Sequence, residues 1–96
     1  MAIRLIITIT AAPGKAVDLS DSLQARCADV MTAEPGCEQF EWFRSVVNPN
    51  TFVLLARWRD QAALDVHNGR PHAPAPQPPL QVDRGQREDY VYNRTR

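Results

Sequence analysis

The chain has 96 residues, of which 44% are hydrophobic and 23% charged, and its eleven acidic residues balance its eleven basic ones. This length predicts one domain over residues 1–96 with a thin core, because a domain of this size buries only about 60 to 65% of its unfolded surface. The balanced charge excludes the basic footprint of a nucleic-acid-binding protein.

Alternating apolar residues predict a first strand over residues 3–10. Its two faces are Ile3, Leu5, Ile7 and Ile9 on one side, and Arg4, Ile6, Thr8 and Thr10 on the other. Because neither face carries much charge, we expect both to be covered. The stretch is too short and too interrupted by threonine for a signal peptide, and no run approaches the roughly 18 apolar residues of a membrane span. We therefore expect a cytoplasmic protein that does not contact membranes.

A helical stripe follows over residues 15–33. Its apolar members recur every three or four positions and are Ala16, Leu19, Leu23, Cys27, Val30 and Met31. Pro35 and Gly36 are expected to end this helix. Cys27 and Cys37 are the two cysteines, and they form no C-x-x-C pair, so a zinc or redox motif is not expected. A disulfide between them stays open, although two small buried hydrophobic side chains are the favoured interpretation.

Two further strands, over residues 37–46 and 51–58, form an antiparallel hairpin around the turn Asn48-Pro49-Asn50. On the first of these strands one predicted face carries Glu38, Phe40, Trp42 and Arg44. On the second strand one predicted face carries Phe52, Leu54, Ala56 and Trp58.

Asp60 is a plausible N-cap for a short second helix that reaches His67 and ends at Gly69. Five prolines then fall between positions 71 and 79, which predicts an extended proline-rich loop over residues 71–87. A last strand is expected over residues 88–93, followed by a frayed tail at 94–96.

The predicted order β-α-β-β-α-β indicates an α+β protein of ferredoxin-like topology, with an antiparallel sheet and both helices on one face. The other face of that sheet would still expose apolar residues. We therefore expect a homodimer in which two sheets pack face to face.

Two side chains carry the candidate chemistry. His67 is the best general base in the chain, because a neutral imidazole near pH 7 can accept a phenolic proton. Trp58 could form the wall of a pocket for a flat aromatic substrate or take part in electron transfer. Each has a structural alternative: Trp58 as a core aromatic, and His67 as a partner of backbone carbonyls at a helix end.

A dry pocket around them would be lined by apolar residues from three strands, with a second histidine at its edge. The candidates are Ile7, Ile9, Phe40, Trp42, Phe52, Leu54 and His72. Pro71 separates His67 from His72, so no helical metal site is expected. Arg44 and Arg57 could pair with an acidic substrate, although most such arginines are simply solvated.

One block of sequence resembles the antibiotic biosynthesis monooxygenase family over residues 3–73. The block consists of Glu34-Pro35-Gly36-Cys37, Phe40, Asn48-Pro49, Phe52-Val53-Leu54, Trp58 and Ala63-Leu64-x-x-His67. The resemblance implies a dimeric α/β barrel and cofactor-free oxidation of phenols or hydroquinones, and the family also includes haem-degrading relatives. Ala56 stands where the family often has Glu, and the proline run replaces sequence that is usually helical.

The expected function is a monooxygenase that oxidises an electron-rich aromatic, a quinol or polyphenol, with O2. No G-x-G-x-x-G or P-loop motif is present, so cofactor-free chemistry is the simplest route for an oxygenase. His67 and Trp58 would be its catalytic residues. Two alternatives stay open: a ligand-binding dimer without catalysis, and a haem-binding relative in which His67 or His72 is the axial ligand.

Overall fold

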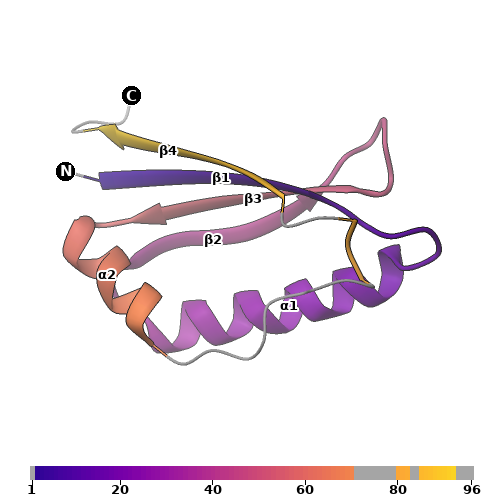
Figure 1. Cartoon of the computed structure of the whole chain (residues 1–96). Helices are drawn as coiled ribbons and strands as arrows, with labels where there is room; N and C mark the ends of the chain where they lie inside the picture. The colour runs from indigo at the N-terminus through magenta and orange to yellow at the C-terminus, as the bar shows by residue number, and fades with distance from the viewer. Residues whose placement is uncertain (1, 71–79, 83–84, 93–96) are drawn as a thin grey trace.

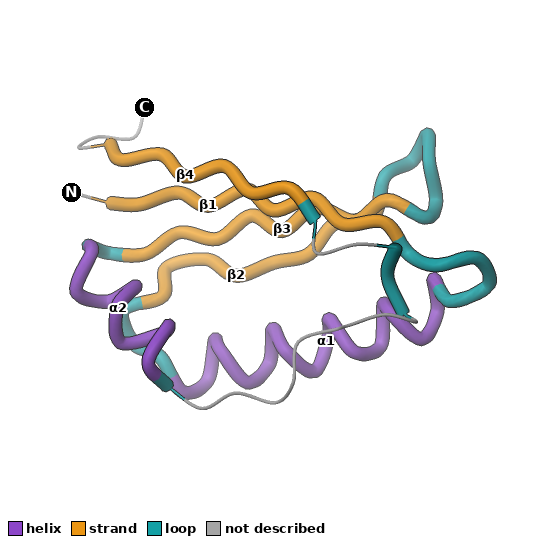
Figure 2. Tube along the Cα trace, viewed as in Figure 1, coloured by secondary structure: helices purple, strands orange, loops and turns teal. Residues whose placement is uncertain are grey.

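Figure 1 shows a computed structural model of the chain, which describes residues 2–70, 80–82 and 85–92. These residues form a four-stranded antiparallel sheet, and both helices cover one face of it (Figures 1 and 2). The element order is β-α-β-β-α-β, which confirms the ferredoxin-like α+β prediction. In the described part of the chain, no helix has the length and apolar character that a membrane span requires.

The strands are β1 (Ala2–Thr10), β2 (Cys37–Arg44), β3 (Thr51–Trp58) and β4 (Gln86–Tyr92), in the spatial order β2-β3-β1-β4. β4 begins two residues earlier than expected, inside the segment assigned to the loop, because β1 pairs with it from Thr8 onward. Positions 71–79 and 83–84 of the predicted proline-rich loop, the last residue of the expected strand and the tail at 94–96 lie outside the described residues.

Helix α1 (Ala16–Ala33) lies along the sheet beneath β2 and buries the predicted stripe at Leu19, Leu23 and Val30. Met31 was expected on this stripe but is 48% exposed. The reason is helical geometry, since Val30 occupies the inward position and the next residue is rotated about 100° away.

A β-bulge between Cys37 and Gln39 corrects the predicted faces of β2. The alternation placed Glu38 on the same side as Phe40, but the extra residue turns Cys37 into the core instead. Glu38 is exposed and pairs with Arg57 of β3 across 2.8 Å.

Helix α2 (Gln61–Gly69) begins at the predicted N-cap, where the Asp60 carboxylate accepts a hydrogen bond from the Ala63 amide at 2.9 Å. This backbone hydrogen bond lowers the pKa of Asp60 below its usual value. The buried face of α2 carries Ala63, Leu64 and His67. The cap therefore sets the rotation that turns His67 toward the sheet.

The core divides into two clusters. One lies under α2 and the end of α1, around Trp58, Phe40 and Leu54. The other lies under the first half of α1, around Leu23 and Phe52. Trp42 packs against both clusters, so the second strand joins the two halves of the core.

Gly36 is required where the turn after α1 passes α2. A Cβ atom at this position would lie 2.5 Å from the Cβ of Ala63, closer than two carbon atoms that are not bonded can approach.

We expect Gly36→Ala to lower the free energy of unfolding by about 1–3 kcal/mol, the usual cost of overpacking. Denaturant midpoints measure this change. Gly69→Ala is the matched control, because a Cβ there meets no atom within 4 Å and its stability should be unchanged or slightly higher. Equal midpoints for Gly36→Ala and the wild type would contradict this interpretation.

Candidate active site

The side chain of His67 meets a buried carboxylate. Its Nδ1 lies 3.0 Å from Oε1 and 2.9 Å from Oε2 of Glu34, which is 5% exposed. An ionised carboxylate can only accept hydrogen bonds, so it holds the proton of His67 on Nδ1, and the neutral form of the ring then has its lone pair on Nε2. The pair therefore orients the imidazole and selects the nitrogen that can act as a base.

Arg70, just past the end of α2, completes this arrangement. Its Nη1 donates to Glu34 Oε2 at 2.8 Å, and its Nη2 donates to Asp29 Oδ1 at 2.8 Å. A buried carboxylate is tolerated only when it is paired and hydrogen-bonded. The guanidinium meets that requirement and also links α1 to the C-terminal end of α2.

Trp58 and His67, nine residues apart in sequence, are in contact. Their ring centroids lie 4.5 Å apart with an interplanar angle of 38°, and Phe40 packs beside them at 5.9 Å from His67 and 6.4 Å from Trp58. Trp58 is fully buried. Its indole Nε1 is buried without an acceptor in the described part of the chain, which costs about 1–3 kcal/mol and is unusual away from functional sites.

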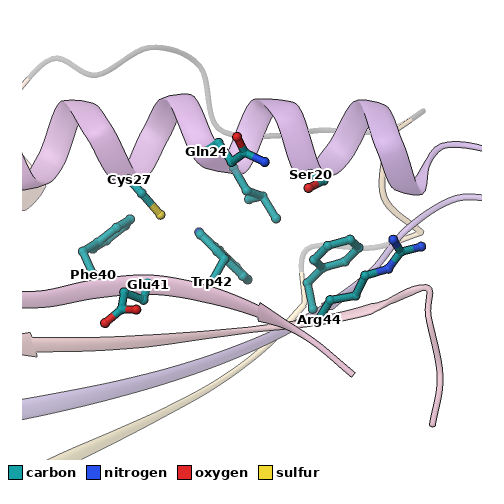
Figure 3. A pocket seen from close by; sticks show the side chains of 9 residues that line it. Ser20, Gln24, Cys27, Phe40, Glu41, Trp42 and Arg44 are labelled. Carbon is teal, nitrogen blue, oxygen red and sulfur yellow. The ribbon is translucent and has the colours of Figure 1, made fainter. Parts of the chain in front are cut away.

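A cavity of about 290 Å³ lies between α1 and the strand β2, and Figure 3 shows the side chains that line it. Its lining comes from both elements and from β3, and consists of Ser20, Leu23, Gln24, Cys27, Phe40, Glu41, Trp42, Arg44 and Phe52. Neither Trp58 nor His67 belongs to this lining. Phe40 belongs to both sites, because it borders the cavity and contacts the two rings.

The other expected pocket residues are distributed differently. Phe40, Trp42 and Phe52 line the cavity, whereas Ile9 and Leu54 are buried in the core and Ile7 packs against both core clusters. His72 lies outside the described residues. Within the described ranges, no group of three or more His, Cys, Asp or Glu side chains is placed to hold a metal.

Ala56 is fully buried, opposite Leu5 on one side and Phe40 on the other. A carboxylate at this position would lie in an apolar layer. The acidic partner of His67 comes instead from Glu34, at the C-cap of α1. The Glu-Pro-Gly turn marked this residue as part of a helix stop, but nothing in the sequence linked it to a histidine 33 positions away or to Arg70 and Asp29.

Both cysteines are free thiols, so the open alternative of a disulfide does not hold. Burial raises the pKa of Cys37 to about 11, and burial also raises the pKa of Cys27. The thiolate is the reactive form of cysteine, so both side chains are weak nucleophiles at neutral pH.

A family model described as "Antibiotic biosynthesis monooxygenase" matches residues 2–77. The chain is 45% identical to "Putative monooxygenase YcnE" of Bacillus subtilis (strain 168) over 40 aligned residues, which cover 42% of this chain and 42% of that one. The fold is similar to Rv0793 of Mycobacterium tuberculosis, with a TM-score of 0.82, 23% identity, and coverage of 99% of this chain and 98% of that one. The fold is also similar to PA3566 of Pseudomonas aeruginosa, with a TM-score of 0.77 and 27% sequence identity, and the match covers 97% of this chain and 95% of that one.

The Glu34 carboxylate should contribute more to stability than an exposed one. Glu34→Gln keeps the shape of the side chain but removes the charge that His67 and Arg70 contact. We expect a loss of about 1.5–3 kcal/mol in the free energy of unfolding, the usual value for a hydrogen bond to a charged group. Chemical denaturation measures it.

Glu38→Gln is the control for this substitution, because its ion pair with Arg57 is partly exposed. The loss there should be about 0–1 kcal/mol. If the two variants lose the same free energy, the buried cluster has no special role in stability.

Proposed function

We propose that this chain, which belongs to the antibiotic biosynthesis monooxygenase family, is a monooxygenase that oxidises a small electron-rich aromatic, such as a hydroquinone, with O2 and without a metal or organic cofactor. The single observation that carries the proposal is the Glu34–His67 pair packed against Trp58. It provides an oriented base beside a buried aromatic ring, and the aromatic wall of the neighbouring cavity comes from Phe40, Trp42 and Phe52.

The reaction balances without a further reductant. A hydroquinone and O2 give a hydroxyquinone and water: one oxygen atom enters the ring, the other leaves as water, and the substrate supplies all four electrons. The barrier lies in the first electron transfer to O2, and a phenolate gives up an electron more readily than a phenol. A base that removes the phenolic proton therefore starts the reaction.

His67 is the proposed base. Nε2 would accept the phenolic proton, and the Glu34 carboxylate at Nδ1 would stabilise the imidazolium that forms. The cavity is the proposed binding site of the ring. Phe40 borders the cavity and packs beside His67, so rotation of its side chain is the proposed route by which a substrate hydroxyl reaches the imidazole.

We further propose that two copies of the chain pack through the sheet face opposite the helices. The centre of this face consists of Ile6 paired with Leu55, and Val53 beside Phe43. The rim carries charged side chains: Arg4, Glu41, Arg57 and Glu88. An apolar centre with a polar rim is the usual anatomy of a protein interface, and a small domain gains core by covering it.

Oxygen uptake with a panel of hydroquinones tests the proposed activity. We expect His67→Ala to lower the rate by about 10²-fold or more, the usual contribution of a general base. Asp65→Asn is the control on the same helix, because Asp65 is exposed and bonds to Gln61, and this variant should keep the wild-type rate. No uptake above the buffer rate, or an unchanged rate in His67→Ala, would refute the proposal.

The lining of the cavity favours a second candidate, a ligand-binding protein without turnover, because neither His67 nor Trp58 borders the cavity. A thermal-shift screen with quinones and hydroquinones distinguishes the two candidates. Ligands that raise the melting temperature while no oxygen is consumed would support binding alone.

A charge at the centre of the proposed interface should separate the two copies. We expect the wild type to sediment at twice the 10.8 kDa mass of the chain, and Leu55→Glu to sediment as a monomer. Burying an unpaired carboxylate in an apolar interface is strongly unfavourable. Val17→Glu is the control, because Val17 is 69% exposed on α1, away from the sheet face. A wild type that is monomeric at micromolar concentration would contradict the dimer.

A further inference from the structure

We propose that Arg44 makes the cavity between α1 and β2 selective for aromatics that carry an anionic substituent, a carboxylate on or beside the ring. This inference deepens the proposed function, since it names the class of substrate that the same cavity would take. It depends on three features of the cavity: the position of the guanidinium, the absence of an acidic partner for it among the described residues, and the chemistry of the surrounding wall.

The guanidinium of Arg44 is held at one end of the cavity. Its Nε donates to the Pro49 carbonyl at 2.5 Å, and its central carbon lies 5.6 Å from the centroid of the Phe52 ring. Among the described residues, these two contacts orient the group and use one of its five N–H donors. The two terminal nitrogens are left to bind a planar anion such as a carboxylate, for which the guanidinium geometry is suited.

No described acidic side chain forms an ion pair with Arg44. Glu41 also borders the cavity, but Figure 3 shows its carboxylate on the opposite side of β2 from α1. Its Oε1 accepts a hydrogen bond from Gln39 there. The charged group on the cavity side of β2 is therefore the Arg44 guanidinium, although the negative charge of Glu41 still reaches Cys27 and contributes, after burial, to the raised pKa of that thiol.

The rest of the wall fits a flat ring. Phe40 and Trp42 come from β2 and Phe52 from β3, and all three border the same space. From α1, Cys27 is directed toward this space between the two β2 aromatics, and Ser20 and Gln24 add neutral polar groups (Figure 3). A volume of about 290 Å³ is just below the usual range of about 300–1,000 Å³ for ligand sites, so it suits a small ligand of one or two rings.

Binding of two matched probes tests the inference, measured by calorimetry without oxygen so that no turnover occurs. The probes are 1,4-dihydroxy-2-naphthoate and 1,4-dihydroxynaphthalene, which differ only in the carboxylate. We expect the wild type to bind the carboxylate probe about tenfold more tightly, as a charge-assisted hydrogen bond provides. Arg44→Gln should bind the two probes equally while its affinity for the uncharged probe is unchanged.

Two further variants complete the experiment. Arg44→Lys keeps the charge without the planar geometry, and we expect it to retain part of the preference. Arg59→Gln removes the same charge from an exposed arginine that does not border the cavity, and it should keep the full preference. A wild type without preference, or an Arg44→Gln variant that keeps it, would overturn the inference. The binding experiment is independent of turnover because it is done without oxygen. A protein that binds the probes as expected, but shows no oxygen uptake in the separate activity assay, would therefore refute only the proposed catalysis.

Discussion

The buried carboxylate of Glu34 is the interaction on which the arrangement of this molecule depends. It lies at the point where α1 ends and the chain turns toward β2, and it contacts both His67 and Arg70. Removing a charge from water is costly unless partners compensate it, so the carboxylate requires α2 to bring a cation and an imidazole to it. The position of α2 in turn places the His67 ring on Trp58.

The same region contains the features that a purely structural core would avoid. The turn passes α2 so closely that only glycine fits at position 36, and the buried indole N–H of Trp58 has no acceptor among the described residues. Natural proteins usually keep such costs where function requires them. The indole Nε1 of Trp42, in the cavity wall, is a second buried donor without an acceptor among the described residues, so these costs occur at both the aromatic cluster and the cavity.

The cavity and the aromatic cluster are neighbours rather than one site. The cavity lies between the middle of α1 and β2, and the aromatic cluster lies between α2 and the sheet. Phe40 belongs to both. A ring that borders the cavity and packs against the imidazole can keep water away from it and can also admit a substrate when it rotates. The proposed chemistry therefore depends on the side-chain motion of one residue as well as on the static geometry.

The amino-acid sequence by itself determined the fold class, because the periods of its apolar residues, the turn at Asn48-Pro49-Asn50 and the Asp60 cap are local signals that the tertiary structure left unchanged. It also identified Trp58 and His67 as neighbours, since a strand end and a short capped helix bring them together. Only the tertiary structure decided which face of β2 is buried at Cys37, because a bulge is a property of strand pairing. Only the tertiary structure joined Glu34, Asp29 and Arg70, because salt bridges between distant positions leave no periodic trace in a single sequence.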